Sequence, residues 1–123
     1  MWKFMFTHKA DQVGEKKNFN TLHYLIHLAK PRILVSPQNY TIIQGTTVTL
    51  TCNSSGNPQP IILWMKEGHL VLKGKGANTL TFDHIKVQDS GRYQCISSNL
   101  AGNVSSVSSF LFVYCMYSAI NLF

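Results

Sequence analysis

The stretch of sequence that decides the fold is Asp89-Ser90-Gly91-Arg92-Tyr93-Gln94-Cys95. Its second half alternates in character, so Tyr93 and Cys95 face one side of a predicted strand and their neighbours face the other. Cys52 occupies an inward position of an earlier predicted strand, and Trp64 lies on a strand between the two cysteines. These side chains predict the centre of a small hydrophobic core.

The surrounding chain is predicted to form a series of short strands. Runs rich in Val, Ile, Thr, Leu and Phe are separated by Gly, Pro, Asn and Ser at intervals of roughly ten residues, which is typical of an all-β sandwich. Glu67-Gly68 is predicted as a hairpin tip, residues 55–60 as a loop and residues 101–103 as a hairpin turn. The predicted strands are Ile33–Ser36, Tyr40–Gln44, Thr46–Asn53, Ile61–Lys66, Leu70–Leu72, Thr79–Phe82, Gly91–Ser98 and Val104–Val113.

The outward positions of these strands explain why the chain carries so few charges. Charged residues make up 13% of the 123 residues, against about 25% in an ordinary globular protein. Val48 and Leu50 face inward, while Thr49 and Thr51 alternate with them on the outer side. We therefore expect Ser and Thr, rather than Lys and Glu, to cover the outer faces of the sandwich.

The combined spacings resemble an immunoglobulin domain of the I-set or C2-like type. The resemblance extends from Pro31 to Tyr114. This part of the chain is similar to the tandem domains of roundabout-type receptors, peroxidasin, hemicentin and papilin. It implies an antiparallel β-sandwich in which a Cys52–Cys95 disulfide joins the sheets, Trp64 packs against it and the Tyr93 hydroxyl ties a corner to the backbone. The residues that carry the resemblance are Cys52, Trp64, Leu80, Phe82, Asp89, Gly91, Tyr93 and Cys95, with the runs 56–60 and 99–102.

The cysteines and the segment after Leu72 leave three points open. A Cys52–Cys95 bridge implies an oxidising compartment, and the alternative is two buried free thiols, as in intracellular muscle-type domains. Cys115 has no partner of its own and is either an exposed thiol, half of an intermolecular bridge or part of a segment that does not fold. Family members pair the residue matching Asp89 with an Arg at the start of strand D. Here residues 72–76 are short and offer only Lys73 or Lys75, so we expect a reduced strand D and leave that ion pair open.

Three regions are predicted along the chain: an N-terminal segment (1–32), the immunoglobulin-like domain (33–114) and a short apolar tail (115–123). Residues 1–32 hold six Lys and Arg against two acidic residues, which supplies most of the net charge of +6. The segment is predicted to be poorly ordered or to form a short helix with Phe19, Leu22, Ile26 and Ala29 on one face. It has no clear signal peptide, so we expect the chain to be a piece of a longer protein. No apolar run is long enough for a complete membrane span.

Two sets of surface residues are candidate sites. Three Asn-x-Ser/Thr sequons, at Asn39, Asn53 and Asn103, fall at outward or turn positions and are candidates for N-glycosylation. Lys66, Lys73 and Lys75 gather around the predicted hairpin and could bind a glycosaminoglycan or simply form a solvated edge.

The motifs of common enzymes, metal sites and nucleic-acid readers do not occur, so we expect no catalysis, cofactor, metal or nucleic-acid partner. The resemblance implies a non-catalytic adhesion or recognition module of an extracellular or cell-surface protein, with a protein partner that includes a second copy of the chain among the candidates. One alternative is a module of a peroxidasin- or papilin-like matrix protein, whose enzymatic or inhibitor domain lies outside this chain. A further alternative is an intracellular muscle-type structural module.

Overall fold

A computed structural model describes residues 27–116 of the chain, and these residues form ten strands and one turn of 3-10 helix. Residues 1–26 and 117–123 lie outside the described residues, and with them most of the predicted helix and tail. The elements are β1 (Ala29–Val35), β2 (Tyr40–Ile43), β3 (Val48–Thr51), β4 (Asn53–Asn57), β5 (Ile61–Lys66), β6 (His69–Lys75), β7 (Thr79–Phe82), η1 (Val87–Asp89), β8 (Gly91–Asn99), β9 (Gly102–Ser105) and β10 (Ser109–Tyr114).

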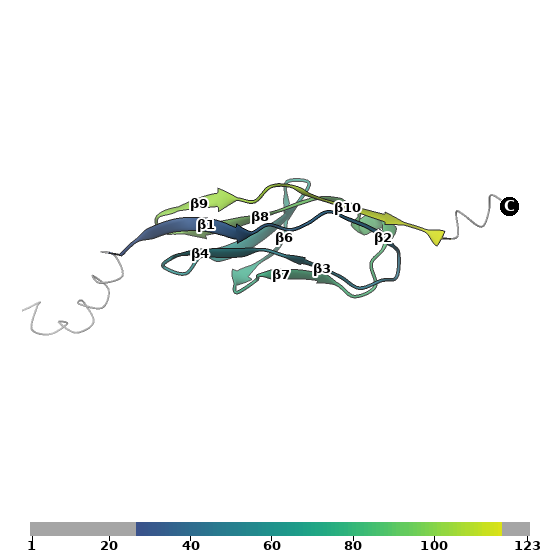
Figure 1. The fold of residues 1–123 in the computed structure, drawn as a ribbon, viewed down its shortest axis with the longest axis horizontal. Helices are drawn as coiled ribbons and strands as arrows, with labels where there is room; N and C mark the ends of the chain where they lie inside the picture. The colour runs from purple at the N-terminus through teal and green to yellow at the C-terminus, as the bar shows by residue number, and fades with distance from the viewer. Residues whose placement is uncertain (1–26, 117–123) are drawn as a thin grey trace, which may run out of the picture.

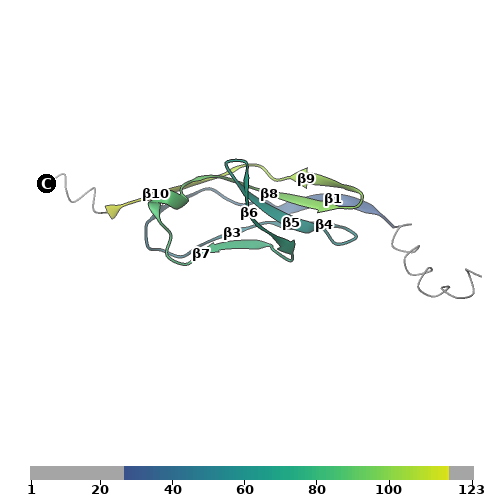
Figure 2. The ribbon, with the colours of Figure 1, turned by 180° about the vertical axis from the view of Figure 1, so that it is seen from behind.

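The strands form two layers, as the all-β prediction requires (Figures 1 and 2). One layer contains the antiparallel pairs β1–β4 and β3–β7. The other is a six-stranded sheet in the order β2-β10-β8-β5-β6, with β9 also paired to β8. Every pair is antiparallel except β2–β10, which run parallel. The first residues of β1 and the last residues of β10 lie at opposite ends of the long axis (Figure 1).

The core lies between the layers and follows the alternation of the strands. In β10 the burial pattern alternates strictly, so Leu111 and Val113 are buried while Phe112 is exposed. The same rule places one side of β3, β5 and β8 in the core. The buried hydrophobic residues are Val48, Leu50, Cys52, Ile62, Trp64, Ile85, Tyr93, Cys95, Leu111 and Val113.

Two predicted strands, Ile61–Lys66 and Thr79–Phe82, are confirmed with their bounds, while the N-terminal part of the domain differs from prediction. The first strand begins at Ala29 rather than Ile33, so Ala29 belongs to a strand and not to a helix. Residues 55–57, predicted as loop, continue β4 because their backbone pairs with β1, with Asn57 opposite Ala29. The loop starts only at the first proline, Pro58.

The last predicted strand, Val104–Val113, is divided into β9 and β10. Three residues, 106–108, separate the two halves, and Ser106 fixes the break by bonding to Cys95 on β8. Its backbone N–H donates to the Cys95 carbonyl over 2.8 Å, and its hydroxyl accepts the Cys95 N–H over 3.0 Å. Local sequence does not encode this break, because it depends on bonds to Cys95, which lies on another strand, 11 residues earlier in the chain.

The expectation of a reduced strand D is confirmed, and the described residues contain no strand at that place. Leu72 to Lys75 extend β6, which pairs with β5 in the six-stranded sheet, and only residues 76–78 connect β6 to β7. Gly76 takes a positive φ of 74° in this link, where a glycine is favoured. In the described part of the chain, no strand therefore pairs with the outer edge of β7.

Candidate binding face and the core that supports it

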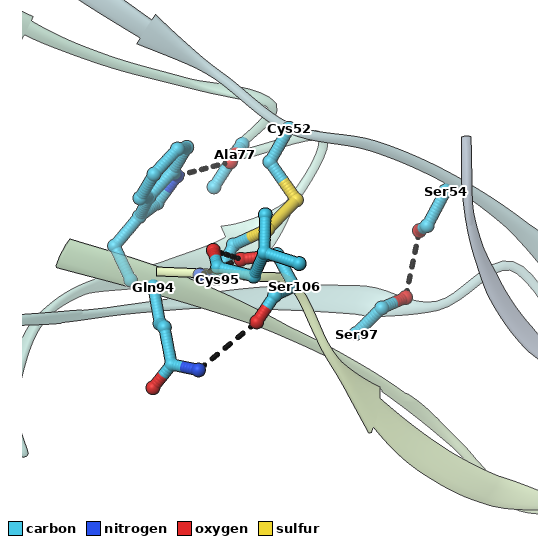
Figure 3. The surroundings of a disulfide bond; sticks show 9 residues. Cys52, Ser54, Ala77, Gln94, Cys95, Ser97 and Ser106 are labelled. Atoms are coloured by element: carbon cyan, nitrogen blue, oxygen red, sulfur yellow. Dashed lines mark hydrogen bonds between the residues drawn. A yellow bond between two sulfur atoms is a disulfide. The ribbon is translucent and has the colours of Figure 1, made fainter. Parts of the chain in front are cut away.

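A disulfide joins the two layers at the centre of the core. Cys52 lies between β3 and β4, Cys95 lies on β8, and both side chains are fully buried. Their Cα atoms are 6.5 Å apart (Figure 3), and the pairing implied by the resemblance is confirmed. The bridge closes a loop of 43 residues, which stabilises a small sandwich by restricting its unfolded state. Cys115 has a free, half-buried thiol.

Trp64 fills the space beside the disulfide. Its side chain is fully buried, and its indole N–H donates a hydrogen bond of 2.8 Å to the Ala77 carbonyl. Ala77 belongs to the short link between β6 and β7, so the indole holds that link against the core. The buried polar atom of the ring is thus satisfied, as a buried tryptophan requires.

Tyr93 ties the turn before β8 to the backbone, as the resemblance implies. Its hydroxyl donates to the Asp89 carbonyl over 2.6 Å, and its ring meets Phe82 edge-on with centroids 5.7 Å apart. Burial, together with the nearby carboxylates of Asp89 and Glu67, raises the pKa of Tyr93 from 10.0 to about 12. The hydroxyl therefore stays protonated and donates well beyond neutral pH.

Asp89 and Gly91 support the same corner. The Asp89 carboxylate accepts the Lys86 N–H over 2.8 Å, and within the described residues it forms no ion pair with Lys73 or Lys75. A Cβ atom at Gly91 would lie 2.9 Å from the Lys66 side chain, so only glycine fits there without a shift. Leu80 packs against the core from β7, at the edge of the buried cluster.

The three predicted basic residues do not form one cluster. Lys66 lies across the Tyr93 ring, 5.8 Å from its centre, and its ammonium donates to the Gln88 carbonyl over 2.7 Å. Lys73 and Lys75 instead stand opposite Leu63 and Ile61 on the outer side of β6. Lys66 thus stabilises the corner around Tyr93, and two lysines remain on the surface.

Buried serines are structural residues that the sequence analysis did not single out. The Ser97 hydroxyl donates to that of Ser54 over 2.6 Å, which links the two layers beside the disulfide (Figure 3). Ser109 is fully buried and its hydroxyl donates to the Gln38 carbonyl. No local signal identifies these serines, because their partners lie 43 and 71 residues away.

The outer face of the β3–β7 pair differs in chemistry from that of the six-stranded sheet, whereas β1 in the first layer also exposes apolar side chains, Leu34 at 58% and Val35 at 42%. On the first layer, four threonines form two cross-strand pairs, Thr49 with Thr81 and Thr51 with Thr79, which we call the threonine face. On the second layer, Phe110, Phe112 and Tyr114 of β10 point outward and are 56%, 58% and 40% exposed, and we call these three the aromatic row. The expectation that Ser and Thr cover both faces is therefore wrong for the second layer.

The aromatic row continues across the six-stranded sheet. We define the broad face as the outward side chains of β2, β10, β8, β5 and β6. Large apolar residues occupy several neighbouring positions, since Leu63 stands opposite Ile96 and Met65 opposite Leu70. The outward residues are Thr41, Ile43, Phe110, Phe112, Tyr114, Arg92, Gln94, Ile96, Ser98, Ile61, Leu63, Met65, Leu70, Lys73 and Lys75.

A hollow of about 420 Å³ lies on the broad face, on the β8 side of the aromatic row. Phe110 and Phe112 line one side, and Arg92 and Glu67 line the other. The guanidinium of Arg92 lies 4.0 Å from the Glu67 carboxylate, whose second oxygen accepts the Arg92 N–H over 2.8 Å. The hollow is therefore apolar on one side and polar on the other, as ligand-binding surfaces commonly are.

The three sequons occupy different surroundings. Asn39 is exposed just before β2, Asn53 is half-buried in β4 opposite Val35, and Asn103 is exposed in β9 opposite Ser98. Among residues 27–116, no three His, Cys, Asp or Glu side chains are grouped so as to hold a metal ion. No helix of this part of the chain is long and apolar enough to cross a membrane.

Two sheets joined by a disulfide, with a tryptophan packed beside it and a tyrosine holding the corner before β8, define a sandwich of the immunoglobulin type. Residues 30–99 match the immunoglobulin domain family. The chain belongs to this family.

Individual relatives agree with the family match. The chain is 33% identical over 102 residues to human peroxidasin homolog and 35% identical over 96 residues to human hemicentin-1. These alignments cover 74% and 71% of the chain but only 7% and 2% of the two relatives. Among solved structures, the tandem immunoglobulin repeats of Dlar are similar with a TM-score of 0.65 and 29% identity, over 71% of this chain and 49% of that one.

Proposed function

We propose that the chain is a non-catalytic recognition module of a secreted or cell-surface protein, and that it binds a protein partner with its broad face. The observation that carries the proposal is the difference between the threonine face and the broad face. The threonine face is polar, whereas the broad face exposes an aromatic row beside further apolar side chains and a hollow. Contiguous exposed apolar surface of this kind is rare in proteins that bind nothing, and it commonly marks an interface.

The charges of the broad face favour a partner with acidic groups. Arg92 is matched by Glu67, whereas Lys73 and Lys75 have no acidic residue among the outward positions of the face. A second copy of the same face would bring further lysines rather than carboxylates. Charge complementarity therefore favours a different protein that presents apolar side chains with an acidic rim.

Two further features support a module outside the cytosol. The Cys52–Cys95 bridge fits an oxidising compartment, and the similarity to peroxidasin and hemicentin fits the secreted or surface proteins that the family resemblance implies. The same features accommodate the alternative of a matrix protein whose enzymatic domain lies elsewhere. The disulfide disfavours an intracellular muscle-type module.

The proposal is tested by measuring the binding of the 123-residue chain, linked into a tetramer, to an array of purified surface and matrix ectodomains. The array also includes the chain itself. A double substitution Leu63→Lys and Met65→Lys should lower binding by about tenfold or more, since it places charge at the centre of the face. The matched control, Thr49→Lys with Thr81→Lys, alters the opposite face and should leave binding unchanged. Equal loss in both variants, or binding to no ectodomain, would overturn the proposal.

A further inference from the structure

The sequon Asn39-Tyr40-Thr41 lies beside the aromatic row. Tyr40 packs against the core, so its neighbours Asn39 and Thr41 face outward. β2 and β10 run parallel, with Thr41 directly opposite Phe112 and Tyr40 opposite Leu111. Continuing this register by one residue brings Asn39 next to Phe110. Both residues that define the sequon thus stand next to the two phenylalanines.

A hydrogen bond fixes the orientation of the Asn39 side chain. Its amide oxygen accepts the Phe110 N–H over 2.8 Å, which ties the side chain to the start of β10. Among the hydrogen bonds of the described residues, none uses the Asn39 amide nitrogen, the atom to which an N-linked glycan is joined. A glycan is therefore compatible with this bond and starts from a side chain that is held against the aromatic row.

The other two sequons lack this arrangement. Asn53 is half-buried and lies in the first layer, opposite Val35. Asn103 lies in β9 opposite Ser98, away from the outward aromatic residues of β10. Only Asn39, of the three, adjoins exposed rings.

We propose that Asn39 carries an N-linked glycan whose first N-acetylglucosamine packs on Phe110 and Phe112. The attachment transfers an oligosaccharide from a lipid-linked diphosphate donor. The Asn39 nitrogen forms a bond to the sugar C1, the C1–O bond to the diphosphate breaks, and one amide proton leaves. The apolar C–H faces of the sugar then cover the β2 side of the aromatic row, while the hollow lies on the β8 side. This inference rests on the secretory location given under the proposed function.

The experiment uses two variants that keep the Asn39 side chain and its hydrogen bond. The full chain is secreted from mammalian cells behind a heterologous signal peptide, as Thr41→Ser, which retains the sequon, and as Thr41→Ala, which destroys it. Peptide mass spectrometry should find a glycan on Asn39 in the wild type and in Thr41→Ser, and none in Thr41→Ala. The glycosylated variant should melt about 4 °C higher than its partner.

The variants Thr41→Ser and Thr41→Ala are then each combined with Phe110→Thr and Phe112→Thr. These two substitutions replace exposed side chains and leave the core intact. If the sugar packs on the rings, the difference in melting temperature between Thr41→Ser and Thr41→Ala should vanish in this background. Unglycosylated samples of each variant supply the intrinsic effect of the substitution, which is subtracted. A difference that persists without the rings, or an Asn39 that stays unmodified, would overturn the inference.

A second readout does not depend on these substitutions. Trimming the glycan to a single N-acetylglucosamine should retain the stabilisation, and the acetyl methyl protons of that sugar should show an upfield ring-current shift by NMR. A methyl resonance at the position of the free sugar would contradict the packing. Because the heterologous signal directs the chain into the secretory pathway, a failure here is separate from a failure of the proposed location or partner binding.

Discussion

The threonine face, on the β3–β7 part of the first layer, and the broad face are outer surfaces of one sandwich, and they share one core. Both are built by strands that alternate inward and outward, and both use residues that favour strands, Thr in one case and Phe or Tyr in the other. The fold therefore accepts either kind of side chain at these positions. The difference indicates that the aromatic residues serve something other than folding, because an exposed ring contributes little to the core.

The core that supports both faces should be the most sensitive part of the molecule. Replacing Cys52 and Cys95 together by Ala removes the 43-residue loop constraint and should lower the free energy of unfolding by about 4 kcal/mol. Chemical denaturation of the oxidised wild type and the double variant measures this loss. The two layers that carry these faces should unfold together in a single transition. Equal stability of the two proteins would show that the bridge does not hold the layers together.

Alkaline pH should lower the stability of the domain through Tyr93, which lies on β8 in the layer that carries the broad face. The pKa of Tyr93 is raised to about 12 in the folded state, so above pH 10 the unfolded chain releases this proton first. Stability should then fall between pH 10 and pH 12, by at most about 1.4 kcal/mol per pH unit. Thermal melts over this range measure the slope.

The control for this effect is Tyr93→Phe. It should flatten the slope because no hydroxyl remains to titrate, and at neutral pH it should cost about 1 kcal/mol through loss of the bond to the Asp89 carbonyl. A slope of the same size in Tyr93→Phe would assign the alkaline loss to other groups.

Exchanging residues between the faces should change surface behaviour far more than stability. In chain produced without glycans, Phe110→Thr with Phe112→Thr should alter the free energy of unfolding by no more than about 0.5 kcal/mol per site. Binding of an apolar fluorescent dye should fall in this variant and rise in Thr49→Phe with Thr81→Phe. Dye binding that is the same in all three proteins would mean that the faces do not differ as surfaces.

A small effect on stability is expected within the threonine face itself. The hydroxyls of Thr49 and Thr81 lie 3.1 Å apart, and Thr49→Ala removes this exposed bond. We expect a loss of roughly 0.2–1 kcal/mol, as for other cross-strand pairs. Thr49→Val keeps the branched shape without the hydroxyl and separates strand preference from the hydrogen bond. Denaturation midpoints of the two variants should differ if the bond contributes.

Alternation and spacing predicted the parts of the fold that depend on near neighbours. They gave the bounds of β5 and β7 and the inward positions of Cys52, Trp64 and Cys95, because a strand repeats every two residues. The same alternation places Phe110, Phe112 and Tyr114 outward. The pattern of the sequence therefore contains the aromatic row as well.

What the sequence could not predict depends on distant pairing. The break at Ser106 depends on bonds to β8, and the continuation of β4 depends on its pairing with β1. The neighbourhood of Asn39 and Phe110 joins residues 71 positions apart, and no local pattern reveals it. From the sequence, Lys66 is indistinguishable from a lysine on the surface. Only the structure shows that its side chain lies across the Tyr93 ring.

The parallel pairing of β2 with β10 also has a mechanical consequence. β1 begins at one end of the long axis and β10 finishes at the other (Figure 1), so tension along the chain pulls β2 and β10 past each other. Their hydrogen bonds are then loaded together in shear, whereas a hairpin pulled from one end opens bond by bond. We therefore expect the domain to resist stretching until these bonds yield at once, which single-molecule pulling would record as one sharp rupture. Gradual extension at low force would contradict this expectation.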